Sequence, residues 1–168
     1  DNYADLFTEP RIRDPFVRSF VWTFAMAALS VAGTFAIGLL LALVFQSDRM
    51  KFKRTYRVLL IIPYALPTFM TILVWRGMMN ETFGILNQVL PWQIPWLNSP
   101  NWARFSVILV NLWLGYAYMF LVATGALTSI PNDLKEAAFV DGATGFTAFR
   151  KVTFPLLLVA MAPVLISS

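Results

Sequence analysis

The sequence predicts an all-α membrane protein, a polytopic bundle of helices that cross a lipid bilayer. Its 168 residues are 58% hydrophobic and only 13% charged, and the mean hydropathy is +0.66. A soluble domain usually carries about 25% charged residues. The apolar residues also form long segments, and roughly 20 consecutive apolar residues suffice to span a bilayer as a helix.

The composition also limits the chemistry that the protein can perform. The sequence has no cysteine and no histidine, which removes thiolate nucleophiles, the commonest metal ligands and the usual general base. Aspartate and glutamate are absent from all four predicted spans. We therefore expect no catalytic residue, no metal site and no cofactor, and an intramembrane enzyme is the weaker alternative class.

The first predicted span covers residues 17–45 and follows a polar, extramembrane lead-in at residues 1–16. The chain starts at Asp1 rather than Met and ends within an apolar segment, so we expect a truncated piece of a longer protein. Small residues recur at intervals of four in the first span, a spacing typical of closely packed membrane helices. They are Ala28, Ala32 and Ala36, and then Gly38 and Ala42.

A basic segment follows and sets the orientation of the spans. Within residues 46–57 a single acid, Asp48, stands against five basic residues: Arg49, Lys51, Lys53, Arg54 and Arg57. Positive charge beside a span marks the cytoplasmic side, so the first span runs inward. We interpret the net charge of +4 in this way rather than as a nucleic-acid signal.

The second predicted span covers residues 58–79 and returns outward. Pro63 and Pro67 interrupt it, which predicts a kink or local unwinding. Arg76 lies near its outer end, where a long side chain can extend to the interface in a structural role. The outer loop at residues 80–102 carries tryptophans, which usually anchor a membrane boundary.

The third predicted span covers residues 103–130 and contains polar groups at membrane depth. Asn111, Leu114, Gly115 and Tyr118 share one helical face by the i, i+3, i+4, i+7 rule. One interpretation is an interhelical hydrogen bond beside a tightly packed glycine. The other is a site for a polyhydroxylated ligand, whose C–H surface a ring covers and whose hydroxyls an amide can bind.

A polar loop at residues 131–151 separates this span from the fourth, at residues 152–168. Pro131 ends the preceding helix, and Asp133 with Glu136 matches a capping box for a new one. Gly142 predicts a left-handed turn at the end of that helix, and Thr144 begins a second short helix. From shape alone, this is equally consistent with an ordinary surface connection.

The residues of this loop resemble a known motif. Glu136-Ala137-Ala138, then Asp141-Gly142 and Val152-x-Phe154-Pro155, are similar to the EAA loop of ABC importer permeases, with Val152 and Phe154 in place of the usual Ile and Leu. The resemblance implies a MetI-like ABC importer permease core, here truncated to about four spans and a cytoplasmic coupling helix. It also implies that the ATPase-coupling residues are Glu136, Ala137, Ala138, Asp141 and Gly142.

Two further stretches narrow the resemblance to the MalF-like maltose/maltodextrin permeases. They are N-x-W-L-G-Y-x-Y at residues 111–118 and the segment at residues 56–67. In that family the matching positions line the sugar site, which implies substrate-binding roles for Asn111, Leu114, Gly115 and Tyr118. Ser168 aligns with a further polar position of that site.

The resemblance implies a transport subunit rather than an enzyme, located in the bacterial inner (cytoplasmic) membrane. It implies as partners two copies of an ABC ATPase, a second MalG-like permease subunit, a periplasmic or lipid-anchored sugar-binding protein and membrane lipid, with no nucleic acid. The sequence has no P-loop pattern, so ATP hydrolysis is expected on another subunit. The alternative is an importer for another oligosaccharide or a polyol phosphate; the Asn111 face carries no basic residue for an anionic cargo.

Overall fold

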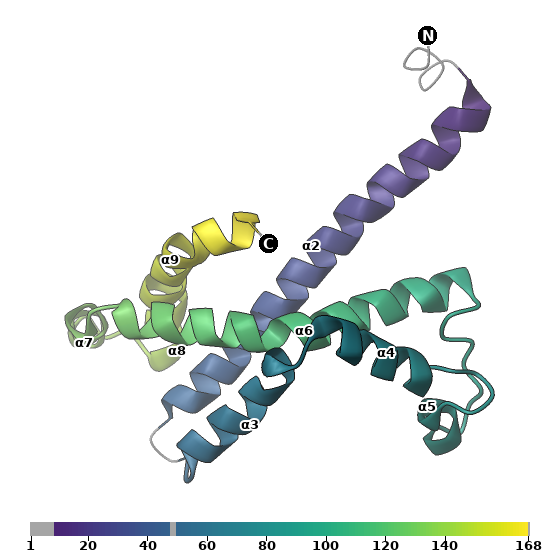
Figure 1. Ribbon diagram of the computed structural model, residues 1–168. Coiled ribbons are helices and arrows are strands. Elements are labelled where there is room, and N and C mark those ends of the chain that lie inside the picture. The colour runs from purple at the N-terminus through teal and green to yellow at the C-terminus, as the bar shows by residue number, and fades with distance from the viewer. Residues whose placement is uncertain (1–8, 48–49, 168) are drawn as a thin grey trace.

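The computed structural model describes residues 9–47 and 50–167, and in this part of the chain every regular element is a helix. The all-α prediction is confirmed. In chain order the elements are α2 (Pro10–Gln46), α3 (Lys53–Ala65), α4 (Thr68–Met78), α5 (Ile85–Val89), α6 (Pro100–Ser129), α7 (Asn132–Val140), α8 (Gly145–Ala148), the π-helix η1 (Phe149–Thr153) and α9 (Phe154–Ser167). Figure 1 shows α2 and α6 as two long crossing helices, with α7 and α8 beyond one end of α6 and α5 near the other.

Three helical stretches of the described residues are long and apolar enough to cross a membrane: Pro10–Gln46, Pro100–Ser129 and Gly145–Ser167. The pair α3 and α4 passes the same test together but is bent by 90°. The bend follows from Pro67, because the residue before a proline is driven into extended conformations, and Leu66 has φ −79° and ψ 141°. The predicted interruption of the second span is therefore confirmed at Pro67, whereas Pro63 lies inside the continuous helix α3. α3 itself begins within the basic segment, at Lys53.

Glycine brings α2 and α6 into close contact where they cross. A Cβ built on Gly38 would lie 2.7 Å from the backbone carbon of Met119, and Ala42, one turn later, is 1% exposed. These two positions confirm the expected packing of small residues. The other three small residues are exposed on α2 and do not pack within the described chain, so for them the expectation stays a prediction: Ala28, Ala32 and Ala36.

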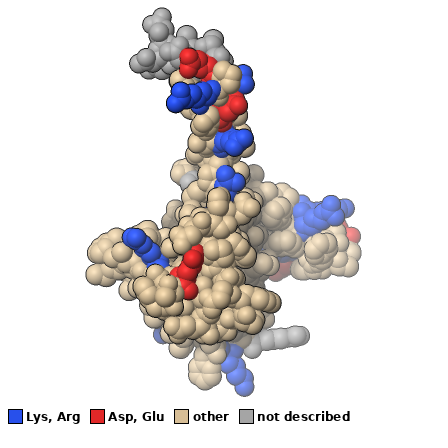
Figure 2. Space-filling model, turned by 90° about the vertical axis from the view of Figure 1, so that its right-hand side faces the viewer, with Lys and Arg blue, Asp and Glu red and all other residues tan. Residues whose placement is uncertain are grey.

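The buried core lies in the half of the molecule nearest α7. It joins α2, α6 and α9, and Phe45 meets Phe120 edge to face with ring centroids 5.3 Å apart. Leu157 and Met161 of α9 are fully buried against it. Elsewhere large apolar side chains face outward, including Phe24 at 62% exposed, as expected where lipid replaces water. On the face in Figure 2, charged side chains gather at the N-terminal end of α2 and in smaller groups at the right, lower left and bottom of the view, and the surface between these groups is uncharged.

The outer loop is organised by the side chain of Asn87. Its amide nitrogen donates to the carbonyl of Ile94 at 3.0 Å, and its oxygen accepts from the Ile94 amide at 3.2 Å and from Trp96 Nε1 at 2.8 Å. The hydroxyl of Ser106 on α6 donates to the Trp96 carbonyl at 3.0 Å. Because these bonds are buried or partly buried, the loop has a defined shape and is attached to α6.

Candidate functional site

A polar hollow of about 340 Å³ lies between α2, α6 and the end of α9. It brings together three of the predicted substrate-binding residues, Asn111, Gly115 and Tyr118, all from α6. The rest of its lining comes from both neighbouring helices and from α6 itself: Ser30, Val31, Thr34, Met119 and Ser167. The one-face prediction for α6 is thus consistent with a real cavity for these three positions.

The polar groups of this hollow are neutral and differ in how they are bonded. Asn111 donates its amide to the Val107 carbonyl of its own helix at 3.1 Å. The Thr34 hydroxyl donates to the Ser30 carbonyl at 2.8 Å. The buried Ser30 hydroxyl has no hydrogen-bond partner among the described residues, which is costly unless a partner arrives. The hollow therefore offers hydrogen-bonding capacity to a ligand or to a neighbouring chain.

Gly115 and Tyr118 occupy this wall for different physical reasons. A Cβ on Gly115 would lie 2.7 Å from Cγ2 of Thr34, so the glycine is needed for close helix packing whether or not a ligand binds. Tyr118 is 40% exposed and stacks on Tyr64 of α3, with ring centroids 6.2 Å apart and planes at 22°. This aromatic pair presents an open ring surface beside the polar hollow.

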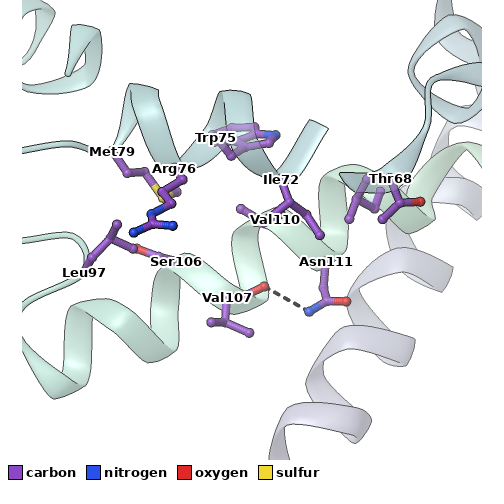
Figure 3. A pocket seen from close by; sticks show the side chains of 11 residues that line it. Thr68, Ile72, Trp75, Arg76, Met79, Leu97, Ser106, Val107, Val110 and Asn111 are labelled. Carbon is purple, nitrogen blue, oxygen red and sulfur yellow. Dashed lines mark hydrogen bonds between the residues drawn. The ribbon is translucent and has the colours of Figure 1, made fainter. Parts of the chain in front are cut away.

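Leu114 lies in a neighbouring, larger hollow of about 520 Å³ between α4 and α6, which Asn111 also lines. Figure 3 shows this hollow: Arg76 reaches from α4 toward Leu97 and Ser106, while Asn111 lies further along α6. Asn111 thus stands on the boundary of the two hollows. Ser168 falls outside the described residues, and its neighbour Ser167 lines the polar hollow instead.

Some lining residues were not identified from the sequence. Ser30 and Thr34 are one turn apart on α2, and polar residues at that spacing in an apolar span were a usable signal. Arg76 received a structural interpretation, although its long side chain enters the larger hollow. Trp75, also in that lining, lies edge to face with Trp113 at 5.8 Å.

The predicted coupling loop folds as two short helices joined at a glycine. Gly142 has φ +83°, which confirms the left-handed turn. The Gly142 amide donates to the Phe139 carbonyl at 3.0 Å and the Ala143 amide to the Ala138 carbonyl at 2.9 Å, the pattern of a Schellman motif. The Thr144 side chain accepts from the Thr147 amide at 3.3 Å, so the predicted start of the second helix is also confirmed.

The predicted capping box at the start of α7 is wrong. Pro131 is the N-cap residue of α7 and no side chain caps this helix. Asp133 is then already inside the first turn, where its charge favours the positive end of the helix dipole but its side chain cannot reach back as a cap. Glu136 is exposed on the same helix.

The elbow formed by α7 and α8 presents apolar side chains to the outside. None of the α7 residues is buried, and Val140 is 87% exposed and Phe146 73% exposed. The predicted coupling residues line this projection: Ala138 is half-buried, and the others are exposed, namely Glu136, Ala137, Asp141 and Gly142. An exposed apolar projection on a polar loop is typical of a protein–protein contact.

Comparisons with known proteins agree with this architecture. A family model described as "Binding-protein-dependent transport system inner membrane component" matches residues 33–168. The maltose/maltodextrin transport system permease protein MalF of Salmonella typhimurium is 44% identical over 99% of this chain and 33% of its own length. The corresponding MalF protein of Escherichia coli K12 is 42% identical over the same shares. The chain therefore spans about one third of the length of these curated relatives.

Solved structures show the same fold. The crystal structure of a bacterial ABC transporter involved in the import of the acidic polysaccharide alginate matches with a TM-score of 0.74 and 23% identity. The match covers 97% of this chain and 56% of that one. A bacterial alginate ABC transporter in complex with an alginate pentasaccharide-bound periplasmic protein matches with a TM-score of 0.76 and 23% identity, over 98% and 56% of the two chains.

The family match covers most of the chain, and the helices have the length and composition of membrane spans. The expected membership of the permease family is therefore confirmed. The chain belongs to the family of binding-protein-dependent transport system inner membrane components, the permeases of ABC importers.

Proposed function

We propose that this chain forms part of the translocation pathway of an ATP-driven importer for maltose or maltodextrin, and that it couples to a separate ATPase subunit through the elbow of α7 and α8. The observation that supports the coupling role is the shape of the elbow. It is an apolar projection, and no residue of its helix α7 is buried. The relatives at 42% and 44% identity are maltose/maltodextrin permeases, which supports the choice of cargo.

The packing around the elbow suggests how movement would pass into the spans. α8 and η1 both contact α7, and η1 also contacts α9; Ala148 and Thr153 are buried there. Lys135 and Phe139 of α7 share a hollow of about 160 Å³ with the end of α2. A push on the elbow would therefore reach α9 and α2, the partners of α6 in the buried core. The spans would then alternate the access of the cargo site between the two sides.

The polar hollow suits an uncharged, polyhydroxylated cargo. All of its lining residues are neutral, and the Ser30 hydroxyl and the Asn111 amide can bond to sugar hydroxyls. The exposed ring of Tyr118 can cover the C–H face of a sugar. The proposed substrate-binding residues are Asn111, Leu114, Gly115, Tyr118 and Ser168, and we propose Ser30 and Thr34 in addition because they line the same hollow.

The cargo site is tested by Tyr118→Ala in the full-length parent chain within its assembled importer. We expect loss of maltodextrin transport with normal assembly and normal basal ATP hydrolysis. Leu121→Ala is the matched control, because Leu121 is on the same helix and 38% exposed but lines neither hollow. Equal transport by the two variants, or failure of Tyr118→Ala to assemble, would favour a packing role for the tyrosine.

The coupling role is tested by a single cysteine, because the sequence contains none. Val140→Cys in a full-length parent made cysteine-free elsewhere should form a nucleotide-sensitive disulfide with a cysteine in the cleft of the ATPase subunit. Ser47→Cys, exposed at the end of α2, is the control outside the elbow. Cross-linking at both positions, or at neither in an assembled complex, would count against the elbow as the coupling element.

A second candidate cargo is anionic, as in an importer for another oligosaccharide or a polyol phosphate. Arg76 of α4 lines the larger hollow together with Asn111, so a positive charge is within the same cavity system. Arg104, two turns before Asn111 on α6, lines neither of the two hollows around Asn111. Arg76→Gln separates the two candidates. Transport of a neutral maltodextrin should be unchanged, whereas transport of an anionic cargo should be lost.

The proposed assembly contains two copies of the ATPase, a second MalG-like permease subunit and a periplasmic or lipid-anchored sugar-binding protein, in the bacterial inner membrane. The many exposed apolar side chains of α2 and α4, such as Leu40 at 63% and Leu73 at 60%, support neighbours that are lipid or apolar helices. Co-purification of the full-length parent with these subunits would test the composition.

A further inference from the structure

A fourth hollow, of about 450 Å³, lies along the N-terminal part of α2, away from the buried core. Its lining consists of five residues of α2 and one of α6: Val17, Arg18, Val21, Trp22, Ala25 and Arg104. Val17, Val21 and Ala25 are spaced four residues apart, and Arg18 and Trp22 follow the first two of them directly. The five residues therefore form one face of the helix. This hollow shares no residue with the two hollows around Asn111 or with the elbow.

Two guanidinium groups face this hollow without a carboxylate in its lining. Arg18 and Arg104 are both exposed. Asp14, the acid one turn before Arg18, is paired with Arg13 at 3.2 Å between Nε and Oδ1. The site therefore carries two positive charges that the described residues do not neutralise, and an anion is the complementary ligand.

The position of Arg104 leaves its donors available. Its guanidinium carbon lies over the Trp22 ring, 4.9 Å from the centroid. A guanidinium stacked on a ring face keeps its N–H groups at the outer edge, where they form a planar fork that matches the oxygens of a phosphate. Trp22 is half-buried and thus fixes one arm of the site.

The depth of the hollow corresponds to the headgroup region of a bilayer. At about 1.5 Å per residue, the helix from Arg18 to Gln46 is about 42 Å long and the helix from Arg104 to Ser129 about 38 Å. A bilayer with its headgroups is about 40–45 Å thick. Measured along each helix, both arginines therefore lie about one membrane thickness from the far end, which is Gln46 beside the basic segment for α2 and Ser129 beside α7 for α6. Val21 and Ala25 come later along α2, so the apolar floor lies toward the hydrocarbon.

We propose that this hollow binds the phosphate of an anionic phospholipid, with Arg18 and Arg104 holding the phosphodiester and Val21 and Ala25 beneath the first part of the acyl chains. The lining favours phosphatidylglycerol over zwitterionic lipids for a physical reason. It contains no carboxylate to accept an ammonium group, and its one aromatic face, that of Trp22, is already covered by Arg104.

The test uses the full-length parent chain in its assembled importer. Native mass spectrometry of the complex, titrated with phosphatidylglycerol or with phosphatidylcholine, counts the lipids that stay bound. Each variant removes charge-assisted hydrogen bonds to the phosphate, so Arg18→Gln or Arg104→Gln should weaken the tightest phosphatidylglycerol binding by about tenfold or more. Arg11→Gln removes the same charge from the same helix outside the hollow and should leave the binding unchanged.

Lysine variants at the two positions protect the test against misfolding. Arg18→Lys and Arg104→Lys keep the charge but lose the planar fork, and we expect binding weaker than in the parent and stronger than in the glutamine variants. Unchanged phosphatidylglycerol retention in all four variants would overturn the proposal. Displacement of the lipid by inorganic phosphate would show a free-anion site instead. Loss of a protein subunit with unchanged lipid retention would show that the arginines pair with a neighbouring chain.

Discussion

The crossing of α2 and α6 gives a quantitative prediction for Gly38→Ala. The new Cβ would lie 2.7 Å from the backbone carbon of Met119 and from the backbone nitrogen of Phe120. Ordinary contact begins near 3.4 Å, so the two helices must separate by about 0.7 Å, because neither backbone atom can rotate away as a side chain does. Overpacking of this kind costs about 1–3 kcal/mol.

Alanine also gains about 1 kcal/mol over glycine in a helix interior, so the appropriate measurement is a difference between two variants. The comparison variant is Gly125→Ala on α6, whose new Cβ meets nothing within 4 Å. Both variants gain the same helix propensity, so this gain cancels in the difference between their stabilities. In thermal unfolding of the purified full-length parent, we expect Gly38→Ala to melt below Gly125→Ala. The difference should be less than the value of about 2–4 °C for each kcal/mol that holds for a domain of about 150–250 residues, because the parent is longer. Equal midpoints would refute the close approach of the two helices.

Three further substitutions probe other parts of the molecule. Gly142→Ala should weaken the elbow by about 1–2 kcal/mol, because its φ of +83° is strained for any residue with a Cβ, and hydrogen exchange across α7 and α8 measures the loss. Asn87→Ala removes three hydrogen bonds from the outer loop and should cost about 2–4 kcal/mol, seen as faster proteolysis within residues 80–99. Tyr116→Phe removes the 3.1 Å bond from its hydroxyl to the backbone of α3 and should lower the unfolding free energy by about 1 kcal/mol.

Two of these substitutions have a control in the same region, and the third has an outcome that would contradict it. Gly145→Ala meets open space without a positive φ and should leave exchange in the elbow nearly unchanged; equal effects at both glycines would contradict the strain argument. Gln88→Ala, beside Asn87, removes one exposed hydrogen bond, so it should destabilise the outer loop less than Asn87→Ala does. For Tyr116, unchanged stability of the phenylalanine variant would mean that α3 is held by apolar contacts alone.

Features set by local backbone chemistry were predictable from the sequence. Gly142 and Thr144 took their expected conformations because a left-handed turn and a hydroxyl cap depend on the residue itself and its immediate neighbours. The capping box at Asp133 failed because Pro131 became the N-cap, which moved the acid into the helix. Proline likewise predicted the break between α3 and α4 but not its angle of 90°, which depends on what each half packs against.

The candidate cargo site was predictable only on one helix. Helical periodicity places Asn111, Gly115 and Tyr118 on a common face of α6, and the structure brings them to one hollow. Ser30 and Thr34 join them because α2 crosses α6 at a particular rotation, and that rotation is set by contacts such as Gly38 on Met119. A one-dimensional pattern does not contain this relation. The roles of these residues toward a sugar remain a prediction.

The position of the crossing also has a mechanical consequence. Gly38 is near the end of α2: the helix extends about 12 Å from it to Gln46 and about 42 Å from it to Pro10, at about 1.5 Å per residue. If α2 turns as a stiff rod about this contact, the two arms have a length ratio of about 3.5. A shift of about 1 Å beside the elbow would then swing the far end of α2 by about 3–4 Å. Because the contact at Gly38 lies so far from the middle of α2, a small displacement on one side of the membrane would become a larger displacement on the other.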